Sequence, residues 1–302
     1  MKKCLYRFPP RPMKQPRSPA QASPLDSAKN LRPLLAIRWL IVAALFIAAA
    51  ILYPRLPEQI PTHWNFAGQP DQYSPKAFGT WLLPGIAFLM AVLFPLLRKL
   101  DPKRDSYKDF LHPWDVIQTA IVAFMGYIFI ITMLATIDPT QSAMVGRYVV
   151  FGIGVLFVLL GNYMGKIRQN WFVGLRTPWT LSDPETWRKS QRFGGWMFVI
   201  GGLVILAEAL VWWHVEWLFF AVVMLIGILP IIYSYLIFPR EKSSAKKGIT
   251  AILLLAVIGI LVGAAIAITI RVASGEDDWT CQNGQWIQHG HPQTPMPKTP
   301  CP

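Results

Sequence analysis

Few residues in this chain have the types and spacing that chemistry requires. His63, with Glu58 and Asp71 nearby, offers metal-donor atoms, but this spacing lacks the HExxH pattern of zinc sites. Glu208 lies within a long apolar segment, where it could serve a proton or substrate site or face other helices as a carboxylate. The sequence contains no GxSxG, P-loop or GxGxxG motif. We therefore expect no enzyme activity, no cofactor and no metal, and a membrane-bound hydrolase is the weakest hypothesis.

Composition places the chain in a membrane. Its 302 residues are 53% hydrophobic and only 15% charged, which is too apolar for the surface of a soluble domain. The net charge of +13 could suggest nucleic acid, but almost all basic residues flank apolar runs. We expect the lipid bilayer as partner and no direct nucleic-acid binding.

Apolar segments of about 20 residues, the length that crosses a bilayer as a helix, recur along the chain. They predict an all-α polytopic bundle of about seven transmembrane helices. Two charged residues near span ends, Arg38 and Asp115, are expected to need no special role. The predicted spans are Leu34–Leu52, Phe78–Leu97, Val116–Ile137, Tyr148–Met164, Gly194–Trp213, Trp217–Phe238 and Ile249–Ile270.

Lys and Arg residues alternate between rich and poor segments along these spans. The leader and every second loop after it carry most of them, and such segments remain in the cytoplasm. This alternation predicts a multi-pass membrane protein with its N-terminus inside and its C-terminus outside. The predicted regions are a disordered basic Pro-rich leader (1–33), two spans with an outer loop (34–97), a third span (98–147), spans four to six (148–238), a seventh span (239–272) and an outer tail (273–302).

This topology puts two of the three cysteines in the outer tail. Cys281 and Cys301 would lie in an oxidising compartment that permits a disulfide, whereas Cys4 would stay reduced inside. Two unpaired thiols remain the alternative, because connectivity cannot be read from sequence.

Two loops have local patterns that suggest defined structure. In the outer loop, turn formers around Gly68 separate short extended stretches, and the loop is expected to contact an external ligand or the membrane surface. In the cytoplasmic loop after the fourth span, Ser182 and Glu185 are spaced as a capping box that would start a helix running toward Gly194. Trp and Arg residues interleave there, either as interfacial anchors or as a docking surface for a cytoplasmic partner or an anionic headgroup.

Both loops resemble signature regions of the SdpI family of bacterial membrane proteins, whose outer loop is a domain of unknown function. The outer match is Ile60-Pro61-Thr62-His63-Trp64 with Gly68 and Pro70-Asp71. The longer, more specific match comprises Gly161-Asn162-Tyr163, Asn170-Trp171-Phe172, Gly174-Leu175-Arg176, Thr177-Pro178-Trp179-Thr180-Leu181 and Trp187-Arg188.

The resemblance implies immunity to an exported toxin peptide and signal transduction through capture of a cytoplasmic autorepressor. We assign the outer-loop ligand contact to Pro61, His63, Trp64, Gly68 and Asp71. We assign repressor docking to Asn170, Gly174, Arg176, Pro178, Trp179, Thr180, Trp187 and Arg188. A small-solute transporter or channel that uses Glu208 is the alternative. The leader, the seventh span and the cysteine-bearing tail depart from the family pattern.

Overall fold

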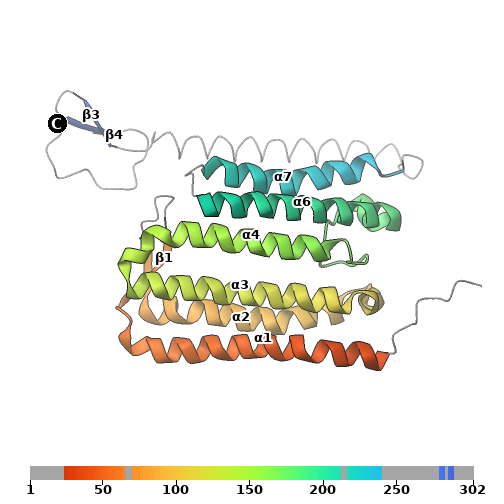
Figure 1. Cartoon of the computed structure of the whole chain (residues 1–302), viewed down its shortest axis with the longest axis horizontal. Coiled ribbons are helices and arrows are strands. Elements are labelled where there is room, and N and C mark those ends of the chain that lie inside the picture. Colours follow the sequence, from red (N-terminus) through yellow and green to blue (C-terminus); the bar gives the residue numbers. More distant parts are fainter. Residues whose placement is uncertain (1–23, 65–69, 212–215, 240–278, 283–284, 289–302) are drawn as a thin grey trace, which may run out of the picture.

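The computed structural model describes residues 24–64, 70–211, 216–239, 279–282 and 285–288, and is dominated by long helices that run side by side (Figure 1). The long helices are α1 (Pro24–Leu52), α2 (Lys76–Leu100), α3 (Leu111–Ile137), α4 (Val145–Met164), α6 (Pro184–Val211) and α7 (Glu216–Leu236). Shorter elements are η1 (Tyr53–Arg55), β1 (Gln59–Trp64), β2 (Pro70–Pro75), η2 (Arg104–Asp109), η3 (Pro139–Met144), α5 (Pro178–Ser182), β3 (Trp279–Gln282) and β4 (Gln285–Gln288).

Six of these helices are long and apolar enough to cross a membrane, which confirms the all-α polytopic class. The expected seventh span, Ile249–Ile270, lies outside the described residues. Helix α1 begins at Pro24, inside the expected leader, because proline is tolerated in the first turn of a helix. Pro33 also lies within this helix.

The helices alternate in direction, so the connections gather at two ends of the bundle (Figure 1). The hairpin end carries the antiparallel pair β1–β2 and the short helix η3. The basic end carries residues 98–110 and 165–192, which contain eleven Lys and Arg residues (Arg98, Lys99, Lys103, Arg104, Lys108, Lys166, Arg168, Arg176, Arg188, Lys189 and Arg192). The predicted orientation would place the basic end in the cytoplasm.

Helices α1 and α3 are joined by an ion pair in the bundle. Arg38 is fully buried, and its guanidinium lies 2.9 Å from Asp115 and donates to Gln118 at 2.5 Å. The expectation that Arg38 and Asp115 need no special role is therefore wrong. A buried charge at this depth needs a partner, and the partner lies on a helix that sequence spacing does not connect to Arg38.

Helices α4 and α6 approach closely through paired glycines. A Cβ atom on Gly161 would lie 2.6 Å from the carbonyl oxygen of Gly195, and one on Gly202 would lie 2.9 Å from that of Gly154. Small residues of this kind let helix backbones touch in membranes. This contact fixes the start of α6 against the end of α4, where the basic-end loop connects them.

Candidate functional site

The hairpin β1–β2 is fixed to the bundle at its base. Ile60 is fully buried, and the absence of a side chain at Gly79 of α2 gives it room, since a Cβ there would lie 2.8 Å from that of Ile60. Pro61 is also buried, and Trp64 is half-buried against a buried cluster of Ile131, Ala135 and Val145. These two residues of the expected ligand contact therefore anchor the hairpin.

The tip side of the hairpin presents polar groups to solvent. The register shifts on either side of His63 mark an irregular pairing, and His63 Nδ1 lies 2.6 Å from Asp71 Oδ1. Their side chains are 59% and 41% exposed. Tyr73, which sequence reasoning missed, is also exposed, whereas Gly68 lies outside the described residues. Glu58 faces Lys76 at 3.9 Å rather than joining His63.

The basic-end loop is organised around one buried amide. Asn170 is fully buried, and its Oδ1 accepts from the backbone N–H groups of Phe172 and Val173 at 2.9 and 2.7 Å. Its Nδ2 donates to the carbonyls of Arg168 and Val173 at 2.8 and 3.0 Å. A side chain that replaces backbone partners in this way fixes the course of a loop.

A second buried group ties this loop to the preceding one. The Asp101 carboxylate accepts from the Lys103 N–H at 2.7 Å, the Tyr107 hydroxyl at 2.9 Å and the Trp171 N–H at 3.0 Å. Burial, followed by the hydrogen bond to Asp101, raises the pKa of Tyr107 well above its usual value of 10.0. Neither Asp101 nor Tyr107 was identified from sequence, because their partners lie on other loops.

Gly174 occupies a backbone turn that requires glycine. Its φ is +102°, and a Cβ would lie 2.7 Å from Gln191 Oε1. Gln191 reaches over from α6 to bond both the N–H and the carbonyl of Leu175 at 3.1 Å. The glycine therefore allows the loop to lie directly on α6.

The short helix α5 carries two of the predicted docking residues inward. Thr177 and Thr180 form a capping box at its start, and Thr180 is fully buried. Trp179 donates its ring N–H to Ser234 of α7 at 2.7 Å and is only 8% exposed. These contacts attach α5 to the bundle.

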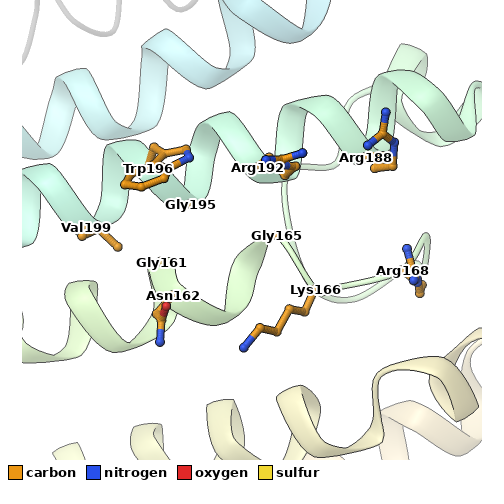
Figure 2. A pocket seen from close by; sticks show the side chains of 10 residues that line it. All are labelled: Gly161, Asn162, Gly165, Lys166, Arg168, Arg188, Arg192, Gly195, Trp196 and Val199. Carbon is orange, nitrogen blue, oxygen red and sulfur yellow. The ribbon is translucent and has the colours of Figure 1, made fainter. Parts of the chain in front are cut away.

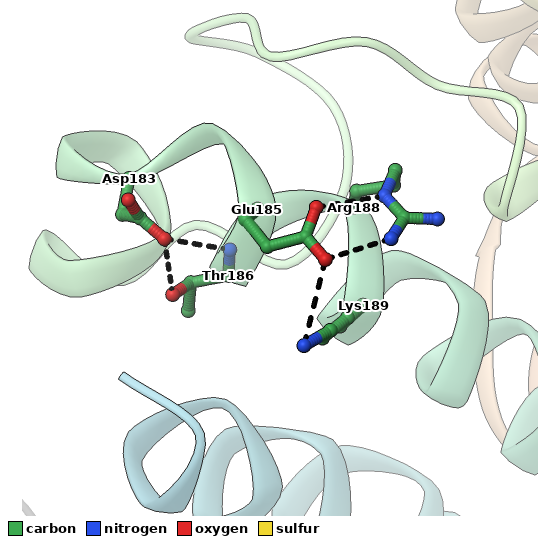
Figure 3. Close-up of polar contacts among 5 residues, drawn as sticks. All are labelled: Asp183, Glu185, Thr186, Arg188 and Lys189. Atoms are coloured by element: carbon green, nitrogen blue, oxygen red, sulfur yellow. Dashed lines mark hydrogen bonds and ion pairs between the residues drawn. The ribbon is translucent and has the colours of Figure 1, made fainter. Parts of the chain in front are cut away.

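The cap of α6 differs from the expected Ser182–Glu185 box. Asp183 accepts from the N–H and hydroxyl of Thr186 at 2.9 and 2.7 Å (Figure 3). Ser182 ends α5 and donates to the Trp179 carbonyl instead. The capping-box prediction is wrong by one residue, because Asp183 stands immediately before Pro184 and is an equally good cap.

Glu185 has a different role from the one that the capping box required. It bonds Arg188 at 2.7 and 2.9 Å and lies 3.4 Å from Lys189 on the exposed side of α6 (Figure 3). Trp187 points the other way, into the loop, and donates to the Ile167 carbonyl at 2.9 Å. It is 2% exposed.

Apart from Gly174, which supplies the turn, the predicted docking residues therefore divide into two groups. Asn170, Trp179, Thr180 and Trp187 are buried and hold the loop together. Arg176, Pro178 and Arg188 are exposed and could touch a partner, and the Arg176 guanidinium folds back onto the Trp171 carbonyl. Docking at this surface stays a prediction.

A pocket of about 420 Å³ opens between the end of α4 and the start of α6 (Figure 2). Four basic residues line it: Lys166, Arg168, Arg188 and Arg192. Its remaining lining residues are Gly161, Asn162, Gly165, Gly195, Trp196 and Val199, so no carboxylate of the described residues lines it. Sequence reasoning missed Lys166, Arg168 and Arg192 as a group.

The residues predicted elsewhere lie apart from these two ends. Glu208 is 8% exposed within α6. Cys281 lies in β3, which pairs with β4. Cys301 is outside the described residues, so the disulfide stays a prediction.

A bundle of helices that can span a membrane, with a hairpin at one end and a basic loop at the other, defines a multi-pass membrane protein. The SdpI/YfhL protein family model matches residues 166–234, and a domain of unknown function (DUF1648) matches residues 40–88. The chain belongs to the SdpI/YfhL family. The first match covers the basic-end loop after α4 with α6 and most of α7. The second covers the C-terminal part of α1, the hairpin and about half of α2.

Two relatives from Bacillus subtilis are similar to the chain. Immunity protein SdpI is 27% identical over 166 residues, which are 55% of this chain and 76% of the relative. The uncharacterized membrane protein YbgB is 37% identical over 65 residues, which are 22% of this chain and 67% of the relative. No solved structure matches the chain.

Proposed function

We propose that this protein gives a bacterial cell immunity to an exported toxic peptide without catalysing a reaction. The similarity to an immunity protein over 76% of that relative's length carries the proposal. The hairpin end supports it, because the exposed His63–Asp71 pair sits on a hairpin whose base is buried in the bundle. A rigid base with an exposed polar tip suits recognition of an external ligand.

The proposal includes a second step, signalling to a cytoplasmic repressor at the basic end. Arg176, Pro178 and Arg188 support it, since they are exposed at the basic end, where Asn170 holds the loop through hydrogen bonds to its backbone. Such a loop presents a surface of fixed shape to a partner.

The test places the chain in a toxin-sensitive bacterium and measures survival in purified killing-factor toxin. Cells that produce the chain are expected to survive at toxin concentrations that kill cells carrying an empty vector. Equal killing of the two would contradict the immunity proposal. A repressor-controlled reporter tests signalling, and Arg176→Ala is expected to abolish its response while survival is kept.

Transport of a small solute is the second candidate. Glu208 favours it, since this carboxyl is buried in a candidate membrane span. Glu208→Gln would then abolish solute uptake in vesicles containing the protein. Unchanged uptake in this variant would contradict a transport mechanism that depends on Glu208.

A further inference from the structure

The basic pocket between α4 and α6 contains more basic side chains than are paired with carboxylates among the described residues. Arg188 forms an ion pair with Glu185, which does not line the pocket. Among the described residues, Lys166, Arg168 and Arg192 form no ion pair, and Lys166 instead lies 4.5 Å from the centre of the Tyr163 ring. Three cations without a carboxylate, lining one pocket, attract an anion.

The pocket has room for a phosphate group because its walls include glycines. Gly161 and Gly195 lie at the closest approach of α4 and α6, and Gly165 follows at the end of α4. Guanidinium groups bind phosphate oxygens in a bidentate manner, and a lysine adds a mobile point charge. Figure 2 shows Arg188 and Arg192 on α6, and Lys166 and Arg168 on the loop that follows α4.

The apolar part of the pocket lining continues along an exposed face of α6. Trp196 and Val199 line the pocket, and the Trp196 side chain is 62% exposed. Exposed apolar residues follow it at helical spacing, which places them on one face of α6. They are Ile200, Leu203, Ala207 and Leu210.

We infer that this pocket binds the phosphate headgroup of an anionic glycerophospholipid, whose acyl chains lie along the Trp196–Leu210 face of α6. The basic pocket alone would suit any soluble phosphate or an acidic protein segment. The apolar face that begins inside the pocket favours the lipid, because a membrane lipid carries both chemistries in one molecule.

The test measures phosphatidylglycerol binding to the full chain in neutral detergent micelles, with phosphatidylcholine as the uncharged comparison. Arg168→Gln together with Arg192→Gln is expected to weaken phosphatidylglycerol binding roughly 25-fold, from the usual effect of two basic residues near a lipid surface. Binding of phosphatidylcholine should not change. Arg168→Lys with Arg192→Lys retains the charge and should keep most of the affinity.

The matched control is Lys99→Gln with Arg104→Gln, which removes two exposed cations from the same end of the bundle outside this pocket. It should leave phosphatidylglycerol binding within about threefold of wild type, since screened charges outside the pocket contribute little. Equal losses in the two double variants, or no loss in either, would overturn the inference. Melting temperatures without lipid verify that each variant is folded.

Two competitors separate the possible ligands. Glycerol phosphate, which lacks acyl chains, should displace phosphatidylglycerol only weakly, and displacement as effective as that by the lipid would overturn the lipid assignment in favour of a soluble phosphate. Displacement by low concentrations of polyglutamate would overturn it in favour of an acidic protein partner.

Discussion

The two ends of the bundle are built in opposite ways. At the basic end, half of the predicted docking residues are buried, and Asn170 and Asp101 hold the loop through hydrogen bonds to its backbone. At the hairpin end, the base is buried while the polar pair His63–Asp71 is exposed. A recognisable motif can therefore mark a framework at one end and a contact surface at the other, and burial separates the two.

The largest predicted effect is on the basic-end framework. Trp187→Ala removes a side chain that is 2% exposed and its bond to the Ile167 carbonyl, so the free energy of unfolding should fall by about 3–5 kcal/mol. Trp196→Ala on the same helix is the control, because its ring is 62% exposed. Thermal denaturation in micelles without anionic lipid measures both. Similar losses in the two variants would contradict the division between framework and surface.

A smaller loss is expected at the carboxylate that joins the two basic-end loops. Asp101→Asn places an amide opposite donors that include the Tyr107 hydroxyl and the Trp171 N–H, which should destabilise the protein by roughly 2 kcal/mol. Asp105→Asn is the matched control, since Asp105 is exposed and its ion-pair partner, Lys108, is exposed as well. Its melting temperature should match that of wild type. A wild-type melting temperature for Asp101→Asn would show that the network does not fix the loop.

The left-handed turn gives a third comparison. Gly174→Ala should reduce stability by about 1–2 kcal/mol, because φ is +102° and the new methyl group meets Gln191. Gly165→Ala is expected to be nearly neutral, since its φ is −64° and its nearest non-local atom would be 3.4 Å away. Chemical denaturation measures the free energy of unfolding of both variants. Equal free energies of unfolding would show that the turn at Gly174 does not require glycine.

The smallest effect is a dependence on alkaline pH. The folded pKa of Tyr107 is raised above the unfolded value, so its stabilising contribution is complete below about pH 10 and declines as pH rises above that value. Melting temperatures between pH 9 and 11 should therefore fall less steeply for Tyr107→Phe than for wild type. Parallel slopes would show that Tyr107 is not held neutral by its contacts.

Sequence reasoning succeeded where one segment determines its own structure. Each described span could be predicted because a run of apolar residues must form a helix in lipid. The strands β1 and β2 were also expected from the turn formers between them.

It failed where a side chain's partner is distant in sequence. Trp179 looked like a docking residue because its bond to Ser234 joins two elements far apart in the chain. Arg38 looked unremarkable because Asp115 lies on another helix. The misplaced cap at Ser182 has a different cause, since two adjacent residues were suitable caps and only packing selects Asp183.

The most direct test of the immunity proposal combines stability with survival at the hairpin end. His63→Ala with Asp71→Ala removes an exposed pair, so its effect on the free energy of unfolding should be below about 1 kcal/mol. Gln72→Ala, on the same strand as Asp71 and also exposed, is the control. The account predicts that cells with the double variant die in purified killing-factor toxin, while cells with wild type or Gln72→Ala survive at equal membrane abundance. Full survival of cells with the double variant would contradict recognition at the hairpin.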